Sequence, residues 1–203
     1  MRLTPITPVT FADLPFAARR SVWWEVPDSF HLTGAEAEFE KEAWVSAMCA
    51  EFADCGFLLG HGAVFYCPPA AAPAAAVLPT GPVSADALLL SSLFIDPGYE
   101  GTGVDVALLH AALMQMTLLG YAAAEAFGYV CDRAGGADAT GPGTVPSAQV
   151  ARAAGFFPAQ FLDDNGFHLV ADHPLVPRYR IALPPADGLL SVAALTDMVA
   201  AAV

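Results

Sequence analysis

The feature that most constrains the fold is the stretch 86–128, in which a strand, a glycine loop, a helix and a second strand follow one another. An apolar run over residues 87–95 predicts a strand, which Pro97 and Gly98 end. The loop EGTG then leads into a largely apolar helix, and residues 122–127 predict a second strand. Free N–H groups and the dipole at the start of such a helix favour an anion such as phosphate. The order predicts a βαβ-like unit with an anion site, although the loop alone also fits a solvated turn before a core helix.

Residues 93–113, LFIDPGYEGTGVDVALLHAAL, resemble the acyl-CoA-binding segment of the GNAT superfamily of N-acetyltransferases. In that family the loop reads Arg or Gln, two residues, Gly, one residue, and Gly or Ala. Gly103 matches the middle glycine, whereas Glu100 stands at the Arg or Gln position and Asp105 at the last position. Further blocks in the same order extend the resemblance over most of residues 10–183.

The resemblance implies an α/β (α+β) fold, with a GNAT-like mixed, mostly antiparallel twisted sheet flanked by helices and a V-shaped split between the central strands. It also implies acetyl-CoA as co-substrate and transfer of its acyl group to a primary amine of a small molecule or peptide. The positions that map onto the acyl-CoA site are Leu93, Phe94 and Ile95 in the strand and Gly101, Thr102, Gly103, Val104 and Asp105 in the loop.

A general base is the side chain that such an activity requires most directly. Glu125, on the second central strand, is the candidate, with Asp132 behind it, because burial raises the pKa of a carboxyl. A hydrogen-bonded or solvent-facing Glu125 is the alternative. The tyrosine acid of the family has no counterpart, since Leu162 stands four residues before Gly166. A non-catalytic GNAT-fold binding or interaction protein that has lost efficient CoA binding is therefore the second functional hypothesis.

The charge balance restricts the partners. The chain of 203 residues has 8 Lys+Arg and 21 Asp+Glu, a formal net charge of -13. This acidity argues against nucleic acid and anionic membranes and suits a cationic acceptor amine. No Lys or Arg occurs between Lys41 and Arg133. Glu100 and Asp105 therefore oppose the phosphates of CoA, unless they turn outward or an arginine reaches the ligand.

Neither a membrane or export segment nor a metal site is expected. The start of the chain lacks the apolar core of a signal peptide, and no segment has the length of a membrane span, so we expect a cytoplasmic protein. The cysteines form no C-x-x-C pair, and the histidines have no metal-ligand spacing, so we expect reduced thiols, structural histidines and no metal. These residues are Cys49, Cys55, Cys67, Cys131, His110, His168 and His173.

The remaining patterns complete the domain. They predict helices over residues 11–20 and 35–54, a hairpin with its turn at His61-Gly62, and an Ala/Pro-rich loop over 68–83 that neither pairs nor continues a helix. The helix at 35–54 should bury Phe39, Trp44, Met48 and Phe52 and expose its charges.

Helices over 145–154 and 158–165 and two closing strands follow. Because the Gly-Phe pair that ends this region of the family maps to Gly166, we expect an insertion of about one helix before it. Residues 1–184 would form the domain. Residues 185–203 would form an apolar helix that packs on the domain or on a partner, which makes a homodimer possible.

Overall fold

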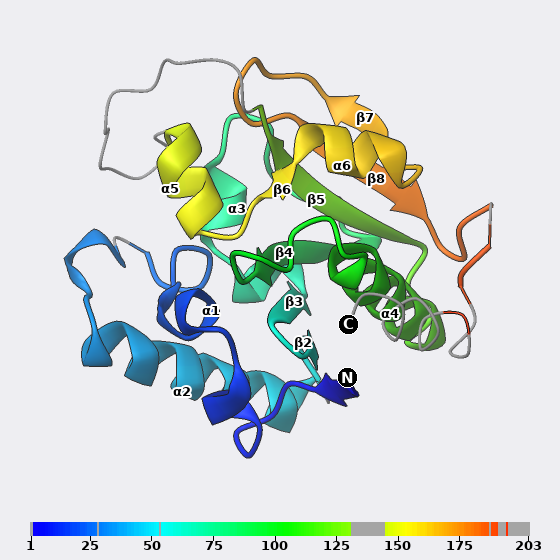
Figure 1. The fold of residues 1–203 in the computed structure, drawn as a ribbon. Helices are drawn as coiled ribbons and strands as arrows, with labels where there is room; N and C mark the ends of the chain where they lie inside the picture. Colours follow the sequence, from blue (N-terminus) through cyan, green and yellow to red (C-terminus); the bar gives the residue numbers. More distant parts are fainter. Residues whose placement is uncertain are drawn as a thin grey trace.

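The computed structural model describes residues 2–27, 29–52, 54–130, 145–186, 188–190 and 194. Within these residues an eight-stranded sheet crosses the molecule in the order β1-β2-β3-β4-β5-β8-β7, and the short β6 pairs with β5 (Figure 1). β4–β5 and β5–β6 are the parallel pairs, and all other pairs are antiparallel. The expectation of a mixed, mostly antiparallel sheet is confirmed. The strands are β1 (Leu3–Pro5), β2 (Gly56–Leu59), β3 (Gly62–Cys67), β4 (Ala87–Ile95), β5 (Ala123–Tyr129), β6 (Phe157–Pro158), β7 (His168–Ala171) and β8 (Arg178–Ala182).

Helices cover both faces of the sheet. The first core lies under α1 (Phe16–Arg20), α2 (Ala35–Glu51), α3 (Ala74–Val77) and α5 (Ala148–Ala153). The second core lies under α4 (Val104–Leu118) and α6 (Ala159–Asp164), so the domain has three layers. We call these the α2-side core and the α4-side core. Short 3-10 turns at Phe11–Asp13, Ser29–His31 and Pro69–Ala71 complete the described helical elements.

The central unit follows its sequence pattern closely. The predicted strand, glycine loop and helix are β4, residues 98–103 and α4, and β5 lies parallel beside β4 as a βαβ unit requires. Gly103 has φ 85° directly before α4, a left-handed conformation that favours glycine. The strand pattern was therefore sufficient to find the structural centre of the fold.

Two predictions for the N-terminal half are wrong in detail. Residues 11–20 form a 3-10 turn and then α1, because Pro15 holds Leu14 extended at ψ 148° and so interrupts the helix. The β2–β3 turn lies at Gly60 and His61, since Gly62 already pairs with Leu59.

The Ala/Pro-rich loop at 68–83 also differs from its prediction, because it contains a 3-10 turn and α3. Each of these begins at or directly after a proline, where the missing N–H removes no helical hydrogen bond.

The predicted buried face of α2 is also wrong in part. Phe39 is 69% exposed, whereas Lys41, expected on the solvated face, is fully buried. Ala37, Lys41, Val45 and Met48 form the buried stripe, and Glu25 supplies the charge that compensates Lys41. The spacing of apolar residues predicted the helix correctly, but the ion pair of Lys41 with Glu25 determines which face of α2 is buried.

The residues before Gly166 form α5 and β6, in the region where an insertion was expected. α6 follows it and ends just before Gly166, and β7 and β8 then form the closing hairpin. The predicted C-terminal helix over 185–203 falls mostly outside the described residues. Among the residues that are described, no helix combines the length and apolar character needed to cross a bilayer.

Candidate functional site

The two central strands separate at a β-bulge. β4 and β5 pair only from Ala87 with Ala123 to Leu90 with Ala126. On the opposite side of β4, β3 is matched with Leu90 and then with Ser92, so Ser91 is an extra residue. An extra residue bends its strand and increases its twist. The V-shaped split expected between the central strands therefore begins at Ser91.

Residues 155–158, which we call the inserted segment, lie between the separated strand ends. The N–H of Leu93 in β4 donates to the carbonyl oxygen of Gly155 over 2.8 Å. On the other side, Gly128 of β5 pairs in parallel with Phe157. Figure 1 shows β6 beside the carboxyl end of β5, between α5 and α6. The chain itself thus contacts both edges of the split.

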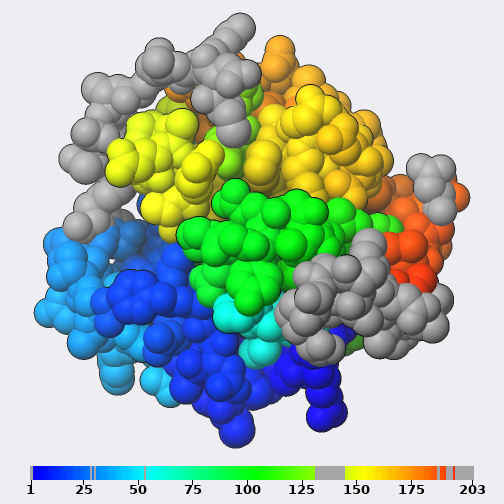
Figure 2. Space-filling view, viewed as in Figure 1, coloured from blue at the N-terminus to red at the C-terminus, as the bar shows by residue number. Residues whose placement is uncertain are grey.

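The side chains of the inserted segment alternate between the two cores, as in a strand. Phe156 is 2% exposed in the α2-side core, and Phe157 is 0% exposed in the α4-side core. Gly155 has φ 74°, and a Cβ at this position would lie 2.7 Å from atoms of Phe94 and of Ser92. In the space-filling view, the green surface of the glycine loop and α4 meets the yellow surface of the α5–α6 region directly (Figure 2). The split is therefore packed with protein.

Two tryptophans hold the inserted segment from the α2 side. The indole Nε1–H of Trp24 donates to the carbonyl oxygen of Ala154 over 2.9 Å. The rings of Trp24 and Trp23 lie 4.4 and 5.0 Å from the ring of Phe156, centroid to centroid. Trp24 is 1% exposed and also packs on Phe127 of β5. Both indoles therefore pack on the α2-side core at this point.

The structure corrects two of the three predicted strand positions. Leu93 was expected to offer its N–H to an acyl-CoA arm, but that N–H is bonded to Gly155. Successive peptide groups in a strand point to opposite sides, so the N–H of Phe94 is directed toward β3. Ile95 shares the orientation of Leu93 and is the position of the three that still fits the expectation.

The glycine loop has the main-chain shape expected for an anion site, with positive φ at Gly101 and Gly103. The N–H of Thr102 is turned inward and donates to the carbonyl oxygen of Tyr99 over 3.3 Å. Val104 is fully buried, so its side chain anchors the start of α4 in the α4-side core. The loop is thus rigidly connected to the core.

Asp105 places a carboxylate at the start of α4. Its Oδ1 accepts a hydrogen bond from the N–H of Val106 over 2.9 Å, and so covers one of the donors that a phosphate would use. Glu100 lies exposed on the same loop. The outward rotation that would relieve repulsion of CoA is therefore not made by Asp105, and at a partly exposed site one such charge opposes a phosphate by about 4 kcal/mol at 4 Å.

Within the described residues, the cations that could offset this repulsion have partners elsewhere. Arg178 and Arg180 bind Glu125 and Asp86, and Lys41 binds Glu25. Arg152 also has an interaction, and Arg133 lies outside the described residues. The ring of His61 also lies beside the loop, where it stacks on Tyr99 at 4.1 Å and its Nδ1 lies 3.3 Å from the Asp96 carboxylate.

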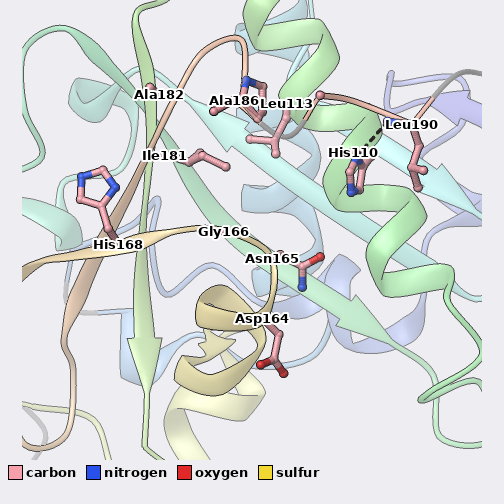
Figure 3. A pocket seen from close by; sticks show the side chains of 12 residues that line it. His110, Leu113, Asp164, Asn165, Gly166, His168, Ile181, Ala182, Ala186 and Leu190 are labelled. Atoms are coloured by element: carbon pink, nitrogen blue, oxygen red, sulfur yellow. Dashed lines mark hydrogen bonds between the residues drawn. The ribbon is translucent and has the colours of Figure 1, made fainter.

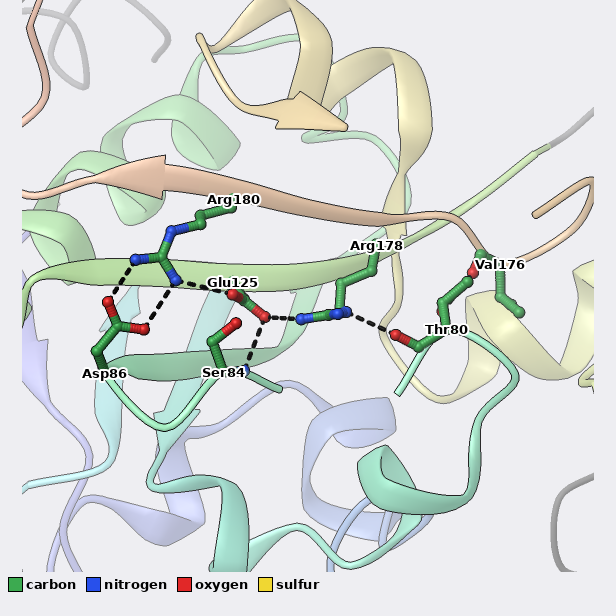
Figure 4. Close-up of polar contacts among 7 residues, drawn as sticks. All are labelled: Thr80, Ser84, Asp86, Glu125, Val176, Arg178 and Arg180. Atoms are coloured by element: carbon green, nitrogen blue, oxygen red, sulfur yellow. Dashed lines mark hydrogen bonds and ion pairs between the residues drawn. The ribbon is translucent and has the colours of Figure 1, made fainter. Parts of the chain in front are cut away.

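Glu125 has partners that correct its proposed role as a base (Figure 4). Its carboxylate accepts hydrogen bonds from the guanidinium groups of Arg178 and, at 2.9 Å, Arg180, and from the N–H of Ser84 at 3.2 Å. Burial raises the pKa of this carboxyl, but the bonds from Ser84, Arg180 and Arg178 outweigh burial and leave the pKa below its usual value. The carboxylate is therefore a poor proton acceptor. Asp132, the second candidate, lies outside the described residues.

The network around Glu125 is instead an anchor between three segments. Arg180 also binds Asp86 at 2.6 Å, directly before β4, and Arg178 donates to the carbonyl oxygen of Thr80 at 2.6 Å. It therefore holds the connection before β4 to β5 and β8.

Sequence patterns missed a second charged pair, between Lys41 of α2 and Glu25. The Lys41 Nζ lies 2.5 Å from the Glu25 Oε1 and 4.2 Å from the centroid of the Phe65 ring. The other carboxylate oxygen of Glu25 is buried without a partner in the described structure. Lys41 lies among acidic residues in the sequence, which is typical of a solvent-exposed helix face, so the sequence did not indicate that Lys41 is buried.

A separate pocket of about 440 Å³ lies between α4, α6 and the chain after β8 (Figure 3). Polar side chains such as His110 and Asn165 and apolar ones such as Leu113 and Ile181 both line this pocket. The N–H of Leu190 donates to the His110 Nδ1 over 3.3 Å, and burial lowers the pKa of His110. This ring is thus held as a neutral structural group, which agrees with the expectation for His110.

Three of the four cysteines lie in the described part of the chain. Cys49, Cys55 and Cys67 are free thiols, and Cys131 lies outside that part. Among the described residues, no group of three or more His, Cys, Asp or Glu side chains is arranged to hold a metal ion.

Comparison with solved structures identifies the fold. An N-acetyltransferase from Staphylococcus aureus superposes with a TM-score of 0.53 at 13% sequence identity, over 90% of this chain and 98% of the other. GphF, a GNAT-like decarboxylase in complex with isobutyryl-CoA, gives 0.51 at 17% identity, over 90% and 100% of the two chains. SsHAT gives 0.50 at 16% identity, over 89% and 97%.

These similarities show that the chain has the GNAT fold, in agreement with the resemblance of its central segment. Neither the protein-family profiles nor the curated proteins give a match.

Proposed function

We propose that the protein is a GNAT-type acyltransferase, which transfers an acyl group from acetyl-CoA to a primary amine of a small molecule or peptide. The observation that carries the proposal is the separation of β4 and β5 at the Ser91 bulge, directly before a glycine loop that leads into α4. Structures of the same fold include an N-acetyltransferase and a complex with isobutyryl-CoA, which supports acyl-CoA as the donor. The net charge of -13 favours a cationic acceptor.

The residues of the closed split do not fit an acyl-CoA arm in this conformation. Leu93 is bonded to Gly155, and Phe156 and Phe157 fill both sides of the sheet at that point. The donors that remain available to acyl-CoA while the split is closed are therefore the main-chain N–H groups of Ile95, Gly101, Gly103, Val104 and Asp105. No side chain is assigned as base, because Glu125 is held ionised.

The second candidate is a non-catalytic GNAT-fold binding protein. The closed split and the carboxylate of Asp105 on the first turn of α4 favour it specifically. In this case the fold would retain its shape while its acyl-CoA site has been lost.

Calorimetry with acetyl-CoA at low salt, followed by a thiol-release assay with a panel of primary amines, tests the two candidates. A transferase gives heat of binding and amine-dependent release of CoA, with cationic amines preferred. A folded chain that gives neither heat nor thiol at millimolar acetyl-CoA, even when substitutions loosen residues 155–158, contradicts the first candidate and supports the second.

A further inference from the structure

The inserted segment has the properties of a bound ligand of the split. It extends along β5 in parallel, takes the N–H of Leu93 on β4, and presents one aromatic side chain to each core. Elsewhere β4 and β5 pair directly, so these four residues replace the pairing that the bulge removes. The space between the strands is filled by chain that comes from a different part of the sequence.

One side chain fixes the entrance of this segment. Trp24 precedes α2 and is 130 residues from Ala154 in the sequence, and its indole N–H satisfies the Ala154 carbonyl in the core. The same ring lies against Phe156 at 4.4 Å and against Phe127 at 5.7 Å. The side chain of Trp24 therefore connects the inserted segment both to β5 and to the N-terminal part of the chain.

We propose that residues 155–158 are an intramolecular occupant of the acyl-CoA arm site, held in place by Trp24, and that acyl-CoA and the inserted segment compete for the N–H of Leu93. This inference rests on the proposed function for the identity of the competitor. The occupancy itself rests on contacts within the chain.

The competition makes Trp24 a positioning residue. Loss of its N–H leaves the Ala154 carbonyl buried without a donor when the segment is in place, and that carbonyl can be hydrated when the segment leaves. Removing the N–H while keeping an aromatic ring should thus favour the open split, without removing any group that would touch acyl-CoA.

Trp24→Phe is the test variant, and Trp44→Phe is its matched control. Trp44 also donates its indole N–H to a backbone carbonyl, that of Ala71, over 2.9 Å, and its ring lies 6.3 Å from that of Phe65 in β3. Two readouts are measured on the full chain: hydrogen exchange of the Leu93 amide by NMR, and acetyl-CoA affinity by calorimetry.

We expect Trp24→Phe to raise the exchange rate of the Leu93 amide by about fivefold, and to tighten acetyl-CoA binding by the same factor, while Trp44→Phe changes neither. Acyl-CoA would itself bond the Leu93 amide, so displacement of the segment is followed at the Trp24 indole N–H: saturating acetyl-CoA should release it from the Ala154 carbonyl and raise its exchange rate in wild type.

The outcomes separate this inference from the proposed function. Faster Leu93 exchange with no acetyl-CoA binding in any variant retains the occupant and rejects acyl-CoA as its competitor. Leu93 protection that is unchanged by Trp24→Phe, or a wild-type Trp24 indole N–H that stays protected at saturating acetyl-CoA, overturns the inference even if the protein is an active transferase. Should Trp24→Phe fail to fold, Phe156→Leu is the second variant, because it weakens the same aromatic contact with a smaller loss of volume.

Discussion

The buried pair of Lys41 and Glu25 gives the largest stability prediction. The two side chains are 0% and 1% exposed, and their charged atoms lie 2.5 Å apart. Lys41→Met keeps a long unbranched side chain but leaves the Glu25 carboxylate buried and uncompensated. Breaking a buried pair in this way costs about 3–5 kcal/mol. For a chain of this length, the corresponding fall in Tm is about 6–20 °C.

Urea unfolding of a double-mutant cycle measures this effect. Lys41→Met and Glu25→Met should each destabilise strongly, whereas the double variant should recover most of the loss, because it contains no buried charge and two apolar side chains of similar volume. The control is Arg20→Met, since Arg20 forms a partly exposed pair with Glu38 at 3.2 Å. Exposed pairs contribute about 0–1 kcal/mol.

Two results would refute this account of the pair. One is a cost for Lys41→Met as small as that of the Arg20 control, which would mean that water reaches the carboxylate of Glu25. The other is additivity in the double variant, which would mean that the two side chains stabilise the fold separately and that the ion pair has no energetic role.

Three further predictions concern the split and the network beside it. Because the pKa of Glu125 is lowered in the folded state, its stabilising contribution is present at neutral pH and is lost as pH falls below its unfolded value of about 4.3. Glu125→Gln should therefore lower the urea midpoint at pH 7 and lower it much less at pH 3; an equal loss at both values contradicts the ionised network. Gly155→Ala should destabilise the fold by about 1–3 kcal/mol more than Gly120→Ala, which has a similar φ of 82° but open space around its Cβ. Equal urea midpoints for the two variants would show that the split is not tightly packed. Glu100→Arg with Asp105→Gly should tighten acetyl-CoA binding at least about tenfold by calorimetry; unchanged affinity would place the phosphates away from this loop.

The central unit could be predicted because its signals are local. The apolar run of β4, the Pro97-Gly98 break and the glycine before α4 each act within a few residues, and the structure keeps all three. The helix of α2 was found for the same reason.

The inserted segment could not be predicted because its structure depends on distant partners. Phe157 forms a strand only because Gly128 lies beside it, and two residues are too few to show a period in the sequence. The role of Glu125 could not be predicted for the same reason, since its partners Arg178 and Arg180 are 53 and 55 residues away in the sequence. From the sequence alone, a carboxylate near the split fits both a general base and a structural ion pair, and only its partners distinguish the two roles.

The energy needed to open the split decides between the two candidate functions. Exposing the side chains of Phe156 and Phe157 costs about 1.5–3 kcal/mol each, or about 3–6 kcal/mol together. Such a cost would leave the open state at about 10⁻² to 10⁻⁴ of the population, so an intrinsic Kd of about 1 μM would be measured at about 0.1–10 mM. Weak acetyl-CoA binding that tightens when the inserted segment is loosened is thus what a self-occupied transferase requires. Micromolar binding by wild type with the Leu93 to Gly155 bond intact would instead mean that the arm of acyl-CoA takes another route across the fold. Absence of binding in every loosened variant would leave the GNAT fold here without its usual ligand, in favour of the non-catalytic candidate.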